Sequence, residues 1–426
     1  MKKILILSLI LVAQLLAQPD FVIEREIIQS GKYFNSELHY FPANQRYKVY
    51  YSYKISYSQL FFEKNDAVFN AGFDVKIEIK DSAGNIIERA FDEKNIAVKD
   101  FEVTNSKDTF LQGLIEFTLD EGNYSIFTLI SDRLSKRERR IPPIELTIDK
   151  SNSILPLIVF EPEKIICDNL DVFVLTNNSS SVPFNKPTND IVIPVLDPGI
   201  SSLNINVRRG DTLFISGEKL TESFLINPEI KFCGDQIVIA KSIDSTLVKI
   251  FLMRDFSSRL TEGPIQLEIY PDDSSKLKQI FNLNVIWIGK PYSLLEPEKA
   301  INYIEIIESK EAVSNILSEN RSDEENLYNY WQLQDPTPET KYNELMNEFY
   351  SRVDYCEINF KTLSGNGGAK SDRGRTYIRF GSPDSIERDT DNNDKVVETW
   401  VYGRIKKKFV FVDLDGTGKF SLANGQ

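Results

Sequence analysis

A repeated alternation of apolar and polar residues is the pattern that most constrains how the first 290 residues can fold. It is clearest in residues 48–57, where Val49, Tyr51, Tyr53 and Ile55 alternate with mainly polar neighbours. A period of two predicts a half-buried β-strand. Short strands of this kind, separated by frequent turns and without a helical pattern between them, are typical of antiparallel sandwiches.

We therefore predict two antiparallel β-sandwich-like (Ig-like) domains, over residues 18–150 and 151–290. The two segments share this periodicity but no repeated residues. In the first, the basic stretch 133–140 is expected to be a solvated loop or an edge strand. In the second, the apolar runs around the turn at 208–211 predict a hairpin.

Near Pro291 the apolar residues begin to recur at helical spacing. Ser322 and Glu325 form a capping-box pattern that predicts the start of a helix. Thr337 is expected to cap a longer helix beginning at Pro338. The predicted apolar face of that helix comprises Leu345, Phe349, Val353, Cys356 and Phe360.

After a glycine-rich stretch at 365–368, the sequence predicts strands at 375–380, 398–402, 408–414 and 419–422. Helices followed by an antiparallel meander predict an α+β domain over residues 291–426. The chain as a whole is therefore expected to be multidomain and mainly β.

Residues 1–17 have the features of a signal peptide. Lys2 and Lys3 precede an almost uninterrupted apolar run, residues 4–16, and Ala17 supplies a small residue for cleavage. The run is too short to span a bilayer, since a helix needs about 20 residues for that. An uncleaved anchor is the alternative. We expect an exported protein, in the periplasm or secreted to the surface or exterior of a bacterium, with no transmembrane segment in the mature chain.

Charge and cysteine content limit the partners and the chemistry. The formal net charge of −13 repels phosphates, so nucleic acid is not an expected partner. The chain has three cysteines. Export permits a disulfide between Cys167 and Cys233, although two buried thiols fit the sequence equally well. Cys356 is expected to be buried on its helix.

Three ordered motifs in the C-terminal segment resemble the GWxTD family. They are Trp331–Glu344, with its Asp335-Pro-Thr-Pro sequence, Asp372–Asp384, which begins Asp-Arg-Gly-Arg, and Glu398–Tyr402. The motif that names the family is altered, because residues 368–372 read Gly-Ala-Lys-Ser-Asp, with Ala369 in place of Trp. If that Trp contacted a ligand, the contact is lost in this chain; if it packed, a neighbour can fill the space. The resemblance implies an exported, multidomain bacterial protein and no particular reaction.

The motif residues have a structural interpretation and a binding interpretation. In the first, Arg373 forms a partly buried ion pair with Asp372, Asp335 or Glu344 and locks a helix to the sheet. In the second, Arg373, Tyr377, Glu398, Trp400 and Tyr402 line a groove for a ligand or peptide. The candidate interaction or structural residues are Trp331, Asp335, Asn343, Glu344, Asp372, Arg373, Tyr377, Asp384, Glu398, Trp400 and Tyr402.

The sequence does not match several patterns that are typical of catalytic or cofactor-binding sites. His39 is the one histidine, so triads and histidine-based zinc sites are not expected. Residues 365–371 lack the Gly directly before Lys-Ser that a phosphate loop needs, and a strand is expected after them. Residues 389–394 lack the glycine of a calcium loop, and 413–418 are better explained as a hairpin turn. We expect no catalytic residues, no metal and no cofactor.

These observations predict a non-catalytic scaffold or interaction protein whose partners are other cell-envelope proteins and whose partner surface lies on the C-terminal domain. The alternative is an acid-dependent hydrolase, or a carbohydrate- or peptide-binding protein, that uses the same domain. The oligomeric state stays open.

Overall fold

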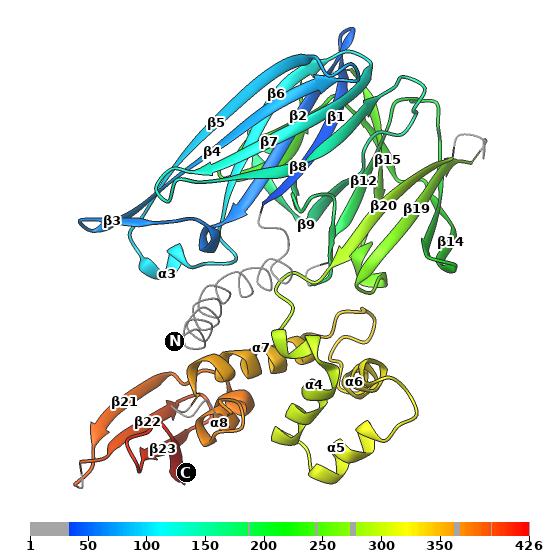
Figure 1. Ribbon diagram of the computed structural model, residues 1–426. Helices are drawn as coiled ribbons and strands as arrows, with labels where there is room; N and C mark the ends of the chain where they lie inside the picture. The colour runs from blue at the N-terminus through cyan, green and yellow to red at the C-terminus, as the bar shows by residue number, and fades with distance from the viewer. Residues whose placement is uncertain are drawn as a thin grey trace, which may run out of the picture. The chain divides into compact units, whose positions relative to one another are not determined.

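The computed structural model describes residues 34–425 except 186–187, 243–245, 273–277, 362–366 and 393 (Figure 1). The expected signal peptide lies outside these residues. The chain divides into two compact units that meet between Ile288 and Gly289. Each unit is described by itself.

The first β-domain consists of two antiparallel sheets. A three-stranded sheet has the order β1-β2-β6, and a five-stranded sheet has the order β3-β4-β7-β8, with β5 paired to β4. The Tyr51 hydroxyl lies 2.9 Å from the Thr128 hydroxyl, which joins the facing sides of β2 and β7. The strands are β1 (Asn35–Ala43), β2 (Arg46–Ser56), β3 (Glu63–Asn65), β4 (Val68–Asp81), β5 (Ile86–Val98), β6 (Phe110–Leu119), β7 (Gly122–Asp132) and β8 (Arg137–Ile148).

Two short helices, η1 (Tyr57–Gln59) and α3 (Phe101–Thr104), connect these strands. The basic stretch 133–140 forms both a turn, at 133–136, and the start of β8, which is an outer strand of its sheet. Pro142 and Pro143 lie in this same strand, at a register shift in its pairing with β7, where missing N–H groups are tolerated.

The second β-domain also has two sheets. The seven-stranded sheet has the order β15-β18-β12-β9-β10-β17-β16, and the five-stranded sheet β11-β20-β19-β13-β14. The predicted hairpin at 208–211 is β13–β14. The strands are β9 (Ile158–Cys167), β10 (Leu170–Leu175), β11 (Val182–Pro183), β12 (Asp190–Val195), β13 (Leu203–Arg209), β14 (Thr212–Leu220), β15 (Ser223–Ile226), β16 (Pro228–Cys233), β17 (Gln236–Lys241), β18 (Val248–Met253), β19 (Gly263–Pro271) and β20 (Gln279–Ile286).

The seven-stranded sheet is strongly curled. Its two outer strands, β15 and β16, are separated in sequence by Asn227 alone. A flat sheet of seven strands would hold its outer strands about 29 Å apart, at about 4.8 Å per step. The sheet must therefore curl until these two edges meet, and the side chains of its inner face converge. Cys167 and Cys233, which the sequence left either paired or free, form a disulfide between β9 and β16.

Strand β2 is buried on both faces, which differs from the half-buried strand expected. Tyr50, Ser52 and Lys54, on the face opposite Tyr51, are buried as well. The Ser52 hydroxyl donates to the Asn177 side-chain oxygen at 3.0 Å, and the Lys54 ammonium group donates to the Thr176 carbonyl oxygen at 2.5 Å. The second β-domain thus covers the outer face of β2, and one hydrophobic cluster runs through both domains.

His39 belongs to this same interface. Its Nε2 lies 3.0 Å from the Glu37 carboxylate, and the Ser180 amide donates to the other Glu37 oxygen at 2.8 Å. Both side chains are 1% exposed. The lone histidine therefore has a structural position between two β-domains.

The C-terminal unit begins with helices and ends in an antiparallel sheet of order β21-β22-β23-β24, an α+β arrangement as predicted (Figure 1). The capping box is present, with Ser322 and Glu325 exchanging hydrogen bonds at the start of α6. The elements are η4 (Tyr292–Leu295), α4 (Pro297–Tyr303), η5 (Ile304–Ile306), α5 (Lys310–Leu317), α6 (Asp323–Gln332), α7 (Glu344–Asn359), α8 (Asp372–Phe380), β21 (Ser385–Thr390), β22 (Val396–Tyr402), β23 (Lys407–Asp413) and β24 (Phe420–Gly425).

Two predictions for this unit are wrong. Thr337 does not cap the long helix; Asn343 does, accepting from the Met346 amide at 2.8 Å. The helix therefore starts six residues later than expected, and Leu345 is exposed instead of facing the core.

The second error concerns residues 375–380, which lie in helix α8 and not in a strand. The Ser371 hydroxyl caps α8 by accepting from the Gly374 amide at 3.0 Å, and Gly381 ends it with φ +81°. A helix therefore follows the glycine-rich stretch, although that stretch still lacks the Gly before Lys-Ser.

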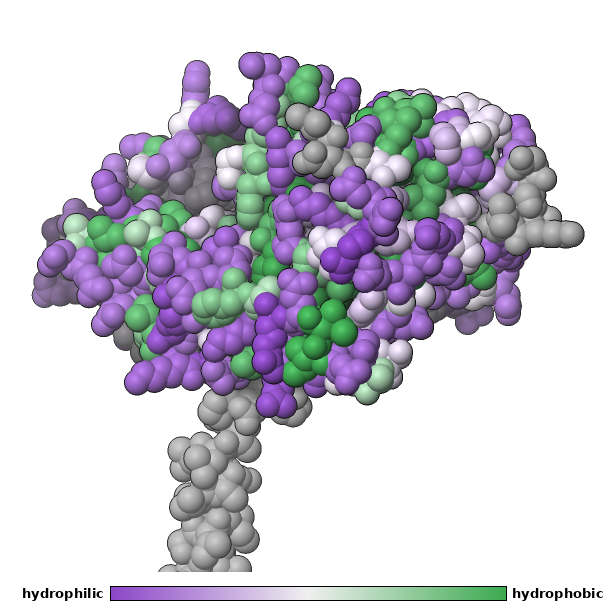
Figure 2. Space-filling view, turned by 90° about the horizontal axis from the view of Figure 1, so that it is seen from above, coloured by the Kyte–Doolittle hydropathy of each residue, from purple (hydrophilic) through white to green (hydrophobic). Residues whose placement is uncertain are grey.

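The surface is mixed in character. Figure 2 shows a mainly hydrophilic face on which hydrophobic side chains occur in separate groups. Among the described residues, no helix is long and apolar enough to cross a membrane.

Candidate functional site

Residues of the second and third motifs meet where helix α8, which packs on α7, contacts the C-terminal sheet. At the centre, Arg373 of α8 and Glu398 of β22 form an ion pair, with 3.2 Å between Nη1 and Oε2. Their side chains are 10% and 4% exposed. The Trp400 indole N–H donates to the same oxygen at 3.3 Å, and the Arg388 Nε donates to the other oxygen, Oε1, at 3.0 Å. Both oxygens of the Glu398 carboxylate are therefore occupied by donors from this chain.

The Arg373 guanidinium group is enclosed by aromatic rings. Its Cζ lies 4.0 Å from the ring centroid of Phe420 and 5.0 Å from that of Phe360. Its Nη2 donates to the Gly418 carbonyl oxygen at 3.3 Å, while its Nε is buried without a partner. A cation that lies between ring faces and pairs with a buried carboxylate is suited to holding the helix against the sheet.

The predicted partners of Arg373 have other contacts. Asp372 accepts from the Leu422 amide at 2.8 Å, so it also joins α8 to the sheet. Asp335 accepts from the Thr337 amide at 2.9 Å, and Glu344 accepts from the Thr337 hydroxyl at 2.6 Å. The expected helix-to-sheet ion pair is present, but with Glu398 as its partner.

Aromatic motif residues continue this junction. The Tyr377 ring stacks on that of Tyr355 in α7, with centroids 4.5 Å apart and an interplanar angle of 15°. Trp400 packs against Phe411, with centroids 4.9 Å apart. The Tyr402 hydroxyl donates to the Gly381 carbonyl oxygen at 2.9 Å and so fixes the end of α8. The five residues of the expected groove do lie together, but most of their polar atoms point into the interior.

The first motif forms a separate group among the helices. The Trp331 indole N–H donates to the Tyr350 hydroxyl at 3.3 Å, which in turn donates to the Ala300 carbonyl oxygen at 2.9 Å. The Asn343 amide group donates to the Trp331 carbonyl oxygen at 2.7 Å. Asp384 lies elsewhere, where its carboxylate accepts from the Gly403 amide and fixes the turn after β22.

Position 369, where the family motif has Trp, is fully buried in this chain. The Ala369 amide donates to the Glu357 carboxylate at 3.1 Å. The neighbouring glycines are required by close backbone approaches: a Cβ on Gly368 would lie 1.9 Å from the Cys356 carbonyl oxygen, and one on Gly374 would lie 2.1 Å from that of Gly368. This position therefore belongs to the packing between α7 and α8.

Three residues of this junction were not among the predicted site residues: Arg388, Asp413 and Phe420. The Asp413 carboxylate accepts from the Thr417 and Gly418 amides, at 3.2 and 2.9 Å, and shapes the hairpin that presents Gly418 to Arg373. The Asp-Leu-Asp-Gly sequence gave a signal for this turn, and the hairpin expected at 413–418 is present. Arg388 and Phe420 reach the junction only through the pairing of strands in the sheet.

The chemistry available at the junction is limited. Burial raises the pKa of the Cys356 thiol to about 12, so this side chain stays protonated and is a poor nucleophile. Within the described parts of the chain, no group of three or more His, Cys, Asp or Glu residues is placed to hold a metal ion.

Comparison with known proteins identifies the same region. Residues 275–420 match the family model of the GWxTD domain. No curated protein matches the chain. Among solved structures, the C-terminal domain of the Streptococcus pyogenes antigen I/II-family protein AspA is similar at 9% identity, over 60% of this chain and all of that chain, with a TM-score of 0.18.

Proposed function

We propose that this chain, whose residues 275–420 form a GWxTD domain, is an exported, non-catalytic interaction protein of the bacterial cell envelope. Its partner surface lies on the C-terminal domain. The observation that supports this most is that the motif residues Arg373, Glu398 and Trp400 form their polar contacts within the domain. Such buried residues stabilise the domain, and the exposed residues beside them are the ones that contact a partner.

The exposed neighbours form a small apolar patch on α7. Tyr355 and Ile358 are 43% and 72% exposed, and they lie three residues apart on the helix, where side chains are neighbours. Tyr377 stacks beneath Tyr355 and links this patch to the buried junction. We call Tyr355, Ile358 and Tyr377 the α7 patch. Clustered apolar side chains on a surface mark sites of protein contact more often than isolated ones do.

The rival function, a hydrolase or a carbohydrate- or peptide-binding protein, would need Arg373 or Glu398 to reach a ligand. Its support is the buried Arg373 Nε, which has no partner. The occupation of both Glu398 oxygens and the burial of the pair favour the interaction function instead.

Site-specific photo-crosslinking in intact cells tests the proposal on the full-length chain. A photoreactive residue at position 358 is expected to capture a defined envelope protein, and Tyr355→Ala is expected to reduce that product. Ile166 is the matched control, because it is 75% exposed on β9. Crosslinking that is equal at 166 and 358, or unchanged by Tyr355→Ala, would refute the α7 patch as the partner surface.

A further inference from the structure

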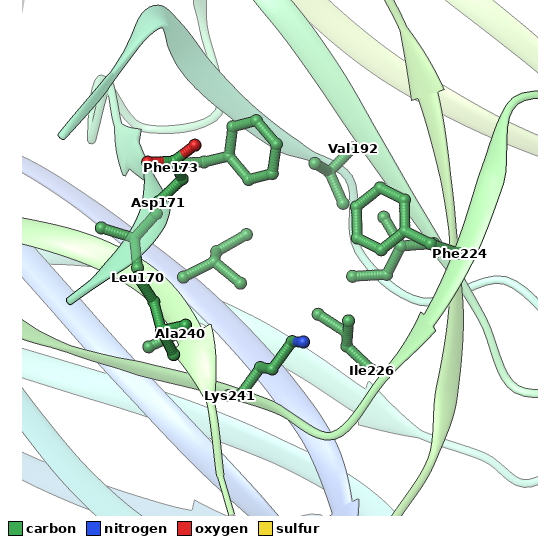
Figure 3. Close-up of a pocket in the computed structure, with 11 residues that line it drawn as sticks. Leu170, Asp171, Phe173, Val192, Phe224, Ile226, Ala240 and Lys241 are labelled. Atoms are coloured by element: carbon green, nitrogen blue, oxygen red, sulfur yellow. The ribbon is translucent and has the colours of Figure 1, made fainter. Parts of the chain in front are cut away.

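A pocket opens at one end of the curled seven-stranded sheet. It has a volume of about 120 Å³ and is lined by strands β10, β12, β15, β17 and β18. Because β15 and β16 are consecutive in the chain, the sheet wraps around this space. Figure 3 shows Phe173, Val192, Phe224 and Ile226 around the same open volume.

The floor of the pocket is apolar and the rim is charged. Val192, Ile226, Ile239 and Ile250 are between 1% and 8% exposed, so they form the floor. At the rim, Leu170 is 51% exposed and the neighbouring lining residues include two charged side chains. A mostly apolar hollow with a few polar groups is the usual form of a small-molecule site.

The two charged lining residues are Lys241 and Asp171, and both are exposed. Lys241 continues the inner face of β17 two residues beyond Ile239, since side chains of a strand alternate. Figure 3 places Lys241 between Ala240 and Ile226, and Asp171 beside Phe173 on another side of the space. Neither charge forms an ion pair or side-chain hydrogen bond with another residue that the structure describes.

A second cation, Lys164, lies near this rim but outside the lining. Lys164 of β9 lies opposite Phe173 in the strand register, with its Nζ 5.1 Å from the centre of the Phe173 ring. The lining itself has one ammonium group, that of Lys241, and one carboxylate, that of Asp171, whereas Lys164 lies outside the lining and interacts with Glu222. A negatively charged head group therefore fits beside Lys241, on a different side of the pocket from Asp171.

The volume limits the size of the tail. An apolar cavity of about 150 Å³ accommodates benzene. A pocket of about 120 Å³ therefore suits an apolar group of about four to six carbon atoms. Longer acyl chains and most drug-sized ligands, which occupy about 300 Å³ or more, do not fit.

We propose that this pocket binds a small carboxylate with a short branched apolar tail, with the tail against Val192, Ile226 and Ile250 and the carboxylate beside Lys241. The site lies in the second β-domain and does not depend on the function proposed for the C-terminal domain.

The test uses the full-length chain and the probe 4-methylpentanoate, with binding followed by calorimetry and by the rise in melting temperature. Saturable binding at millimolar concentration is expected. Acetate, which keeps the head group, and 4-methylpentanamide, which keeps the tail, separate the two contributions. The amide is expected to bind about two- to fivefold more weakly, since an exposed ion pair contributes modestly, and acetate is expected not to bind measurably.

Two variants locate the site. Lys241→Met is expected to weaken the carboxylate about two- to fivefold and to leave the amide unchanged. Ile226→Phe fills the pocket and is expected to abolish binding of both probes. Lys219→Met, on the five-stranded sheet, is the control and should change neither. The proposal is overturned if 4-methylpentanoate does not bind, if the amide binds equally well, or if Lys241→Met and Ile226→Phe both bind like the unchanged protein. If Ile226→Phe fails to fold, the probes and Lys241→Met decide the question.

Discussion

Arg373 and Glu398, which are 25 residues apart in the sequence, form a buried ion pair that joins helix α8 to strand β22. Glu398 also receives Arg388, but the side chain of Arg388 is 72% exposed, whereas that of Arg373 is 10% exposed. The two arginines therefore contribute unequally to the stability of the domain.

Replacing Arg373 by Met is expected to destabilise the C-terminal domain by about 3–5 kcal/mol, because it leaves a buried carboxylate without its main partner. Arg388→Met should cost less than about 1 kcal/mol, since that pair is exposed to solvent on one side. Urea unfolding followed by tryptophan fluorescence measures both, in a Trp287→Phe background that removes the signal of the β-domains. If Arg373→Met instead removed a ligand-binding activity at unchanged stability, the rival function would gain support.

Gly374→Ala is expected to destabilise the same domain by more than about 3 kcal/mol or to prevent its folding. The added Cβ would lie 2.1 Å from the Gly368 carbonyl oxygen, which is backbone and cannot swing away. Gly416→Ala is the matched control: its site has φ +65° and open space, so strain of about 1 kcal/mol is expected. Similar losses in the two variants would show that the close approach of α8 to the 368–369 turn is not required.

Thiol labelling is expected to distinguish the three cysteines. The native protein should take up no iodoacetamide, because Cys356 is fully buried and burial raises its pKa to about 12. The unfolded, unreduced protein should take up one label, and the unfolded, reduced protein three, because Cys167 and Cys233 are disulfide-bonded. Mass spectrometry counts the labels, and three labels without reductant would contradict the disulfide.

The same disulfide is expected to stabilise the second β-domain. It closes a segment with a sequence separation of 66 residues. A loop of that length corresponds to about 4 kcal/mol in the chain-entropy model. The double variant Cys167→Ala with Cys233→Ala, compared with Cys356→Ala by thermal unfolding, should show a loss specific to the paired positions.

The interface between the β-domains is expected to weaken in acid. Burial acts to raise the pKa of Glu37, but the His39 ring, the Ser180 amide and the Lys54 ammonium group outweigh it and hold this pKa below its usual value. A carboxyl group with a lowered folded-state pKa contributes stability that is present above pH 4.5 and lost as pH falls through the folded pKa. The difference in unfolding free energy between the unchanged protein and Glu37→Gln should therefore shrink below pH 4.5. A constant Glu37 difference from pH 7 to pH 3 would contradict the expectation.

The sequence by itself determined those features that depend on neighbours along the chain. The alternation around Tyr51 predicted a strand because the period of side chains in a strand is local, and Ser322 with Glu325 predicted a helix start because both partners lie within one turn. The three motifs also located the C-terminal domain, because their residues and their order along the chain can be read directly from the sequence.

Only the tertiary structure decided the features that depend on distant segments. Residues 375–380 carry strand-forming side chains, yet they are helical, because the missing Cβ of the preceding Gly374 lets α8 pack on the turn at 368–369. The partner of Arg373, the burial of Lys54 and the closing of the seven-stranded sheet likewise depend on which segments meet in space. Local patterns record the periodicity of an element, whereas the partner of a charge is set by packing between elements far apart in the chain.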